Sequence, residues 1–147
     1  MLLIGESAPV SGNFFYIKGA MTTYTARAFE KSYGIKFCDH SDFLNFFRKC
    51  GCYIDDLSLI PVNAMNPKER EQALKGGIKP LSQRILEIRP EIVVSVLRKI
   101  EPYVREAVKM TGLEMIFFVL PFPGNGHQNT YVDGLSNILR QFMPIKT

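Results

Sequence analysis

The sequence predicts an α/β fold in three layers, with helices on both faces of a four-stranded parallel sheet. Four short apolar runs alternate along the chain with segments whose apolar residues recur at helical spacing. The clearest run, Ile92 to Val96, is apolar nearly throughout, as in a parallel strand covered on both faces. Such alternation favours parallel strands joined by right-handed crossovers. With 147 residues, the chain is expected to form one domain, residues 1–147.

The first strand is expected at Leu2 to Ile4, and it ends in a polar loop from Gly5 to Pro9. A flexible turn at 11–13 and three consecutive aromatic residues at 14–16 follow. Loops at the carboxyl ends of parallel strands commonly bind ligands. A glycine, a carboxylate, a hydroxyl and aromatic rings together suit a flat ligand such as a nucleobase, although the rings also suit a hydrophobic core.

Two helices are expected before the second strand. The first runs from Ala20 to Tyr33, and Gly34 stands where a helix commonly ends. The second covers 39–50, with Asp39 or Ser41 as its N-terminal cap.

The second strand is expected from Cys52 to Leu57, with two carboxylates where it ends. A loop at 62–66 and a solvated helix from Pro67 to Lys75 should follow, because Pro67 is well placed at a helix start. The pair Gly76-Gly77 predicts a break before another short helix, which must end before Pro90.

The third strand, 92–96, should lead into a helix whose apolar stripe begins at Leu97 and which ends at Gly112. Pro102 is tolerable only in the first turn of that helix. The fourth strand, 115–119, runs into a loop rich in proline, glycine and asparagine, and a final helix is expected over 131–143.

Composition predicts a globular cytoplasmic protein. Hydrophobic residues make up 46% and charged residues 22% of the chain, and the net charge of +4 favours an anionic partner without requiring one. No apolar run reaches the roughly 18 residues of a membrane span, and no basic segment marks a signal peptide. Cys38, Cys50 and Cys52 lack Cys-x-x-Cys spacing, so we interpret them as reduced thiols and expect no bound metal.

Four landmarks in order give the chain a resemblance to the uracil-DNA glycosylase superfamily over nearly its whole length. They are Gly5-Glu6-Ser7-Ala8-Pro9, Asp55-Asp56-Leu57 with Pro61, Ile88-Arg89-Pro90-Glu91-Ile92-Val93-Val94, and Leu120-Pro121-Phe122-Pro123. The resemblance implies a four-stranded parallel sheet between helices. It also implies an enzyme that flips a base out of DNA and hydrolyses its N-glycosidic bond.

The first loop resembles the Gly-Glu-x-Pro loop of the thermostable and archaeal-type branch, which implies catalytic roles for Glu6, Ser7 and Asn13. Ser7 stands where the family often has Asp or Asn, and Phe122 stands where it has the histidine of His-Pro-Ser. These departures imply a specificity other than plain uracil. Glu6 has an alternative role in binding loop amides, and Asn13 an alternative role as a turn residue.

The resemblance assigns base binding to a set of residues from the first two loops. Asp55 aligns with an edge-reading asparagine, but a carboxylate only accepts hydrogen bonds and therefore prefers two adjacent donors, as on guanine. Asp55 has an equal alternative role as a cap or as the partner of an arginine. The base-binding set is Gly5, Pro9, Phe15, Tyr16, Asp55 and Asn63.

The final loop is expected to contact single- or double-stranded DNA through Pro121, Pro123, Gly124, Asn125 and His127. His127 is alternatively an ordinary exposed loop histidine. The iron-sulfur cluster of the thermostable branch needs an N-terminal Cys-x-x-Cys that is absent here, so we expect no cofactor. We also expect the protein to be a monomer.

Two other hypotheses stay open. One is a non-catalytic protein of the same fold that binds a nucleobase or nucleic acid. The other is an unrelated α/β protein that binds a free nucleotide, against which stands the lack of Gly-x-Gly-x-x-Gly and Walker-type motifs.

Overall fold

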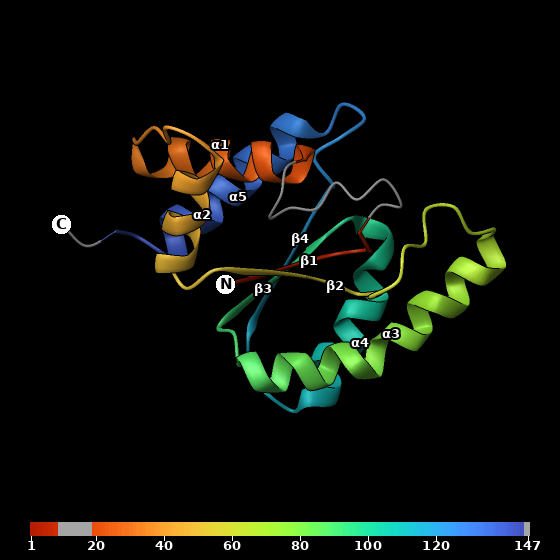
Figure 1. Cartoon of the computed structure of the whole chain (residues 1–147). Coiled ribbons are helices and arrows are strands. Elements are labelled where there is room, and N and C mark those ends of the chain that lie inside the picture. The colour runs from red at the N-terminus through yellow and green to blue at the C-terminus, as the bar shows by residue number, and fades with distance from the viewer. Residues whose placement is uncertain (9–18, 146–147) are drawn as a thin grey trace.

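The computed structural model describes residues 1–8 and 19–145, and in this part of the chain helices lie on both faces of a parallel sheet (Figure 1). The predicted α/β class is thus confirmed. The strands are β1 (Leu2–Gly5), β2 (Tyr53–Asp56), β3 (Ile92–Val96) and β4 (Ile116–Leu120). The helices are α1 (Ala20–Tyr33), α2 (His40–Lys49), α3 (Pro67–Ile88), the 3₁₀ helix η1 (Arg98–Ile100), α4 (Glu101–Thr111) and α5 (Gln128–Phe142).

The sheet has the order β2-β1-β3-β4, and all its strands are parallel. The register pairs Gly5 with Asp56 and Ile4 with Ser95, so the strands end together at one edge. The loops after β1, β2 and β3 therefore meet at that edge, where ligands commonly bind in open α/β sheets.

Two apolar clusters form the core, one on each face of the sheet. Helices α1, α2 and α5 cover one face, with Phe29 and Leu135 against Leu3. Helices α3 and α4 cover the other, with Ile85 against Leu2. Alternate residues of β1 thus enter different clusters, as the two-residue period of a strand requires. All of β3 is buried, which confirms the interpretation of its apolar run.

Several predicted helix ends are confirmed. Gly34 and Gly112 follow α1 and α4 in the left-handed conformation, and the side chain of Asp39 caps α2 by accepting from the backbone N–H of Asp42. Pro102 lies in the first turn of α4, where the missing N–H does no harm.

The predicted break at Gly76-Gly77 is wrong, because α3 runs without interruption from Pro67 to Ile88. Gly77 serves a close approach and not a turn: a Cβ atom there would lie 2.2 Å from the carbonyl oxygen of Leu57. Pro80 also lies inside α3, which bends along its length (Figure 1), as a helix with an internal proline does.

Other boundaries shift by a few residues. The single helix predicted from Leu97 is observed as the 3₁₀ helix η1 followed by α4. Leu97 itself precedes η1 and has φ 115°. Strand β4 lies one residue later than predicted, and α5 begins three residues earlier, at Gln128. No helix in the described part of the chain is long and apolar enough to cross a membrane.

Candidate functional site

A cavity of about 700 Å³ opens at the carboxyl ends of the strands. The loop after β1, the start of α1, the end of β2 and the loops after β3 and β4 surround it. Its size suits a drug-sized or nucleoside-sized ligand. The residues around it include Gly5, Glu6, Ser7, Ala8, Met21, Asp55, Asp56, Asn63, Arg70, Leu97, Phe122 and Asn125.

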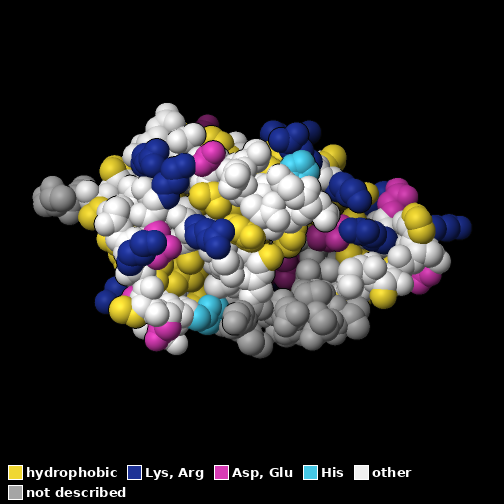
Figure 2. All heavy atoms as spheres, turned by 90° about the horizontal axis from the view of Figure 1, so that it is seen from above, with side chains coloured by type: hydrophobic (Ala, Val, Ile, Leu, Met, Phe, Trp, Pro, Cys, Tyr) yellow, Lys and Arg dark blue, Asp and Glu magenta, His cyan; other side chains and the backbone are white. Residues whose placement is uncertain are grey.

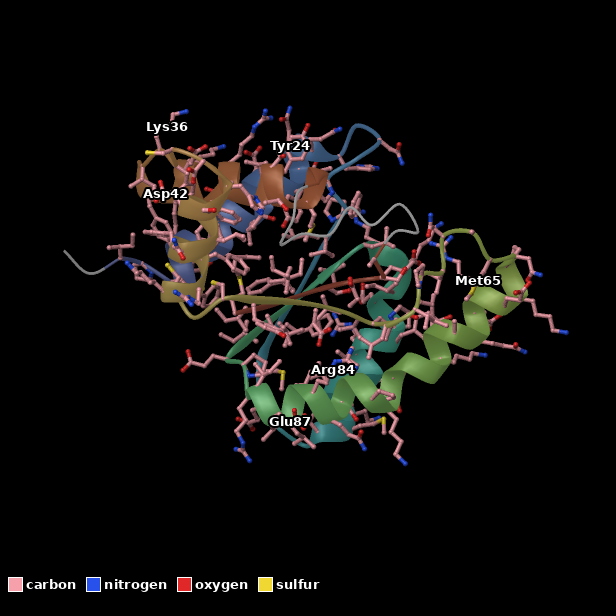
Figure 3. All side chains as sticks on the ribbon, viewed as in Figure 1. Tyr24, Lys36, Asp42, Met65, Arg84 and Glu87 are labelled. Atoms are coloured by element: carbon pink, nitrogen blue, oxygen red, sulfur yellow. The ribbon has the colours of Figure 1, made fainter. Side chains whose placement is uncertain are left out.

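Two arginines of α3 neutralise two of the three carboxylates at this edge. Arg70 binds Glu6 with both Nε, 3.1 Å from Oε2, and Nη2, which contacts Oε1. Arg84 points from α3 toward the end of β2 (Figure 3), where its Nε lies 2.7 Å from Oδ2 of Asp55 and its Nη2 donates to the carbonyl of Asp56. The predicted alternative for Asp55, an arginine partner, is therefore the observed contact.

The Asp56 carboxyl is different, because it has no hydrogen-bond partner among the described residues. It lies against the backbone of Gly5, where an added Cβ would be 2.8 Å from Oδ1 of Asp56. Burial raises its pKa to about 6; the neighbouring Asp55 and Glu6 add to the rise, and Arg84 opposes it. A carboxyl that titrates near neutral pH in a cavity is suited to accept a proton.

Backbone hydrogen bonds join the loops after β1 and β2. The N–H of Leu57 donates to the carbonyl of Gly5 at 2.8 Å, and that of Ser58 donates to Glu6 at 2.9 Å. The hydroxyl oxygen of Ser7 accepts from the N–H of Val62 at 3.2 Å. Glu6 and Ser7 are therefore held in place by their neighbours, but among the described residues the contacts of the Glu6 carboxylate are with Arg70 and not with the loop amides of the predicted alternative.

An apolar wall lies beside these polar groups. Phe122, from the loop after β4, is 42% exposed, and its ring packs so closely on Gly124 that a Cβ there would be 3.2 Å away. Leu97, at the end of β3, has φ 115° and ψ 116°. A non-glycine residue in such a conformation costs about 1–3 kcal/mol, and strain of this kind clusters at functional sites.

The structure brings part of the predicted site together. The predicted residues that line the cavity are Gly5, Glu6, Ser7, Asp55, Asn63 and Asn125. Pro9, Asn13, Phe15 and Tyr16 lie outside the described residues. Pro121 and Pro123 are buried, and His127 is an exposed residue just before α5 that does not line the cavity.

The cavity residues that were not predicted include Asp56, Arg70, Leu97 and Phe122. Asp56 is adjacent to the residue chosen from the motif, and Phe122 carried a signal as an aromatic residue within the final loop. Arg70 looked like part of a solvated helix, and no sequence pattern marks the strained backbone of Leu97.

The three cysteines are free thiols, and burial raises the pKa of Cys52 to about 12. Among the described residues, no three His, Cys, Asp or Glu side chains are grouped as ligands of a metal ion.

Fold and cavity together define an open α/β protein with a cavity at the carboxyl ends of its parallel strands. Neither the models of known protein families nor the curated proteins include one that matches this chain.

Proposed function

We propose that the protein is a divergent member of the uracil-DNA glycosylase superfamily that binds a base flipped out of DNA and hydrolyses its N-glycosidic bond. Its preferred base is not plain uracil. The observation that carries the proposal is the Asp56 carboxyl, which has no hydrogen-bond partner among the described residues, lies in a cavity of about 700 Å³ and has a pKa raised to about 6.

The proposed reaction assigns the role of base to Asp56. As the bond between base and sugar breaks, its electron pair leaves with the base and positive charge develops on the sugar. Water adds to the sugar carbon and gives its proton to the Asp56 carboxylate, which is mostly ionised at pH 7. Glu6 is less suited to this step because Arg70 occupies both its oxygens.

The two ion pairs give the cavity its polarity. Arg70 and Arg84 offset the charges of Glu6 and Asp55, so the carboxylate of Asp56 faces a site with less net repulsion than three free carboxylates would create. The two ion pairs also tie the loop after β1 and the end of β2 to α3 before a ligand binds. Such preorganisation lowers the free-energy cost of binding.

DNA binding is proposed through the cavity and its rim. On the face seen in Figure 2, Lys and Arg side chains lie among Asp and Glu side chains and do not gather into a single track. With a net charge of +4, affinity should fall with added salt, but less steeply than for a protein with a dense basic surface.

The test uses purified protein in excess over duplex and single-stranded oligonucleotides that carry uracil, hypoxanthine, xanthine or a mismatch. Alkali or heat then cleaves the strand at any abasic site formed. We expect product from at least one of these bases, and a loss of about 10²-fold or more in single-turnover rate for Asp56→Asn. Absence of abasic product on every substrate would refute the proposed activity.

The matched control is Asp133→Asn. Asp133 is an exposed residue of α5 whose carboxylate pairs with Lys31, and it does not line the cavity. Its rate should equal that of the unmodified protein. A pH profile adds a second check, since the rate should rise through pH 6 as Asp56 ionises.

A second candidate is a non-catalytic protein that uses the same cavity to bind a nucleobase or nucleic acid. The observation that favours it is the pairing of Glu6 with Arg70 and of Asp55 with Arg84, which engages both carboxylates that the sequence predicted as site residues. It predicts salt-dependent oligonucleotide binding without cleavage, and no effect of Glu6→Gln on that binding.

A further inference from the structure

We infer that Phe122 and Leu97 form the stacking face of the cavity and select a planar heterocyclic ring as its ligand. This inference rests on the proposed function, because it names the residues that would hold the flipped base. The stacking role predicted from the sequence was given to Phe15 and Tyr16, which lie outside the described residues.

The position of Phe122 fits an aromatic platform. The residue lies two positions after the end of β4 and lines the cavity, yet 42% of it stays exposed. Its ring packs on Gly124, where an added Cβ would lie 3.2 Å and 3.3 Å from two ring carbons. Gly124 thus lies beside one edge of the ring, and an exposed aromatic face can stack on any flat base.

Leu97 provides the independent observation. It lies at the end of the neighbouring strand β3, where its N–H donates to the carbonyl of Leu120 at 2.9 Å. With φ 115°, this position favours glycine, yet a large apolar side chain is present and lines the cavity. A leucine held in a conformation of this kind indicates a use for its side chain at the site.

The two side chains complement the polar groups of the cavity. Phe122 and Leu97 follow the adjacent strands β4 and β3, whereas Asp56 ends β2 and Asn63 follows it, on the far side of β1. A flat ring can therefore stack on Phe122 and Leu97 while polar atoms at its rim face Asp56 and Asn63. Apolar surface with a few placed polar groups is the usual composition of a small-molecule site.

The experiment measures how much a base adds to DNA binding. Fluorescein-labelled 15-base-pair duplexes carry uracil, hypoxanthine or xanthine on a 2′-fluoro sugar, whose electron-withdrawing fluorine resists glycosidic cleavage. The reference duplex carries tetrahydrofuran, which lacks a base, at the same place. Anisotropy titrations give the Kd of each duplex, and the Kd ratio is the value for the reference duplex divided by the value for the base-bearing duplex. We expect the base-bearing duplex to bind more tightly, so that this ratio exceeds one.

Replacement of the platform should remove this preference. Phe122→Ala should lower the Kd ratio by about ten-fold, as expected when one base loses its aromatic partner. Phe122→Tyr should preserve the ratio because it keeps the ring. The control is Phe142→Ala, a phenylalanine of similar exposure on α5 that does not line the cavity.

Leu97 is tested by two variants that separate strain from contact. Leu97→Gly and Leu97→Ala should both lower the Kd ratio, whereas Leu97→Gly should have the higher Tm because only glycine relieves the positive φ. An unchanged ratio in both Phe122→Ala and the Leu97 variants would overturn the inference, as would a wild type without base preference on any duplex.

Failure of this inference and failure of the proposed function are distinguishable. Base preference lost in Phe122→Ala, without abasic product from cleavable substrates, would support the stacking face and refute the proposed activity. Abasic product from the wild type, with an unchanged Kd ratio in Phe122→Ala and in both Leu97 variants, would refute the stacking face and support the proposed activity.

Discussion

Asp55 and Asp56 are adjacent in the sequence and have opposite environments. Successive side chains of a strand point to opposite faces of a sheet. Asp55 consequently meets Arg84 of α3, whereas Asp56 lies over Gly5 on the face covered by α1. Asp55 is paired with an arginine, whereas burial favours the neutral form of Asp56 and outweighs the opposing effect of Arg84.

The raised pKa of Asp56 predicts a pH-dependent effect on stability. In the unfolded chain an aspartate has a pKa of about 3.9, whereas that of folded Asp56 is about 6. Between these pH values the folded state binds more protons, so the contribution of Asp56 to the free energy of unfolding decreases as the pH rises from 4 to 6. Above pH 6 the free energy of unfolding has lost the whole of this contribution, which amounts to at most about 3 kcal/mol.

Asp56→Asn removes the buried charge, so it should raise the Tm at pH 8 relative to the unmodified protein and lose most of this advantage at pH 4. Thermal unfolding at the two pH values measures the difference. Asp133→Asn should show no such gain at pH 8, because it removes an exposed carboxylate that is paired with Lys31. Equal shifts of the Asp56→Asn protein at both pH values would show that its carboxyl titrates normally.

At the scale of single elements, α3 supplies the charges that organise the site. Arg70 and Arg84 lie on one helix and reach the loop after β1 and the end of β2. This requires α3 to lie close to the segment that follows β2, and Gly77 permits that approach at Leu57. Gly77 is therefore part of a packed interface.

Two alanine substitutions in α3 test this explanation. Gly77→Ala should destabilise the protein by about 2 kcal/mol or more, because its Cβ would overlap backbone that cannot easily move. Gly76→Ala meets no atom within 4 Å and should stabilise the helix by about 0.5–1 kcal/mol. Urea unfolding gives both values, and similar effects at the two positions would contradict the close approach.

At the scale of the whole molecule, the sheet joins two apolar clusters that share no helix. The strands contribute to both, since Leu3 belongs to one cluster and Leu2 and Ile4 to the other. Helices on both faces therefore pack on the same strands, and loss of packing on one face should also destabilise the helices on the other. This arrangement favours cooperative unfolding.

Phe29→Ala and Ile85→Ala test the coupling from opposite faces. Both side chains are fully buried, and truncation of either should lower the free energy of unfolding by about 2–5 kcal/mol. Far-ultraviolet circular dichroism and tyrosine fluorescence should report one coincident urea transition in each variant. Two separated transitions, with only one of them shifted, would show that the faces unfold independently.

Local sequence signals were sufficient for the fold class. The continuous apolar run of β3, the helical stripes and the stop at Gly34 act within a few residues, so they can be interpreted without knowing the tertiary contacts. The same logic failed at Gly76-Gly77, where a contact with Leu57, distant in sequence, overrides a local preference against helix.

By itself, therefore, the sequence determined a parallel α/β sheet and the edge at which polar loops gather. The tertiary structure decided which of those polar groups are available. Only the register of Gly5 with Asp56 and the reach of α3 place the arginines on the carboxylates of Glu6 and Asp55 and not on that of Asp56. These contacts join residues far apart in the chain, and the pKa of a carboxyl depends on such neighbours and on burial rather than on adjacent residues.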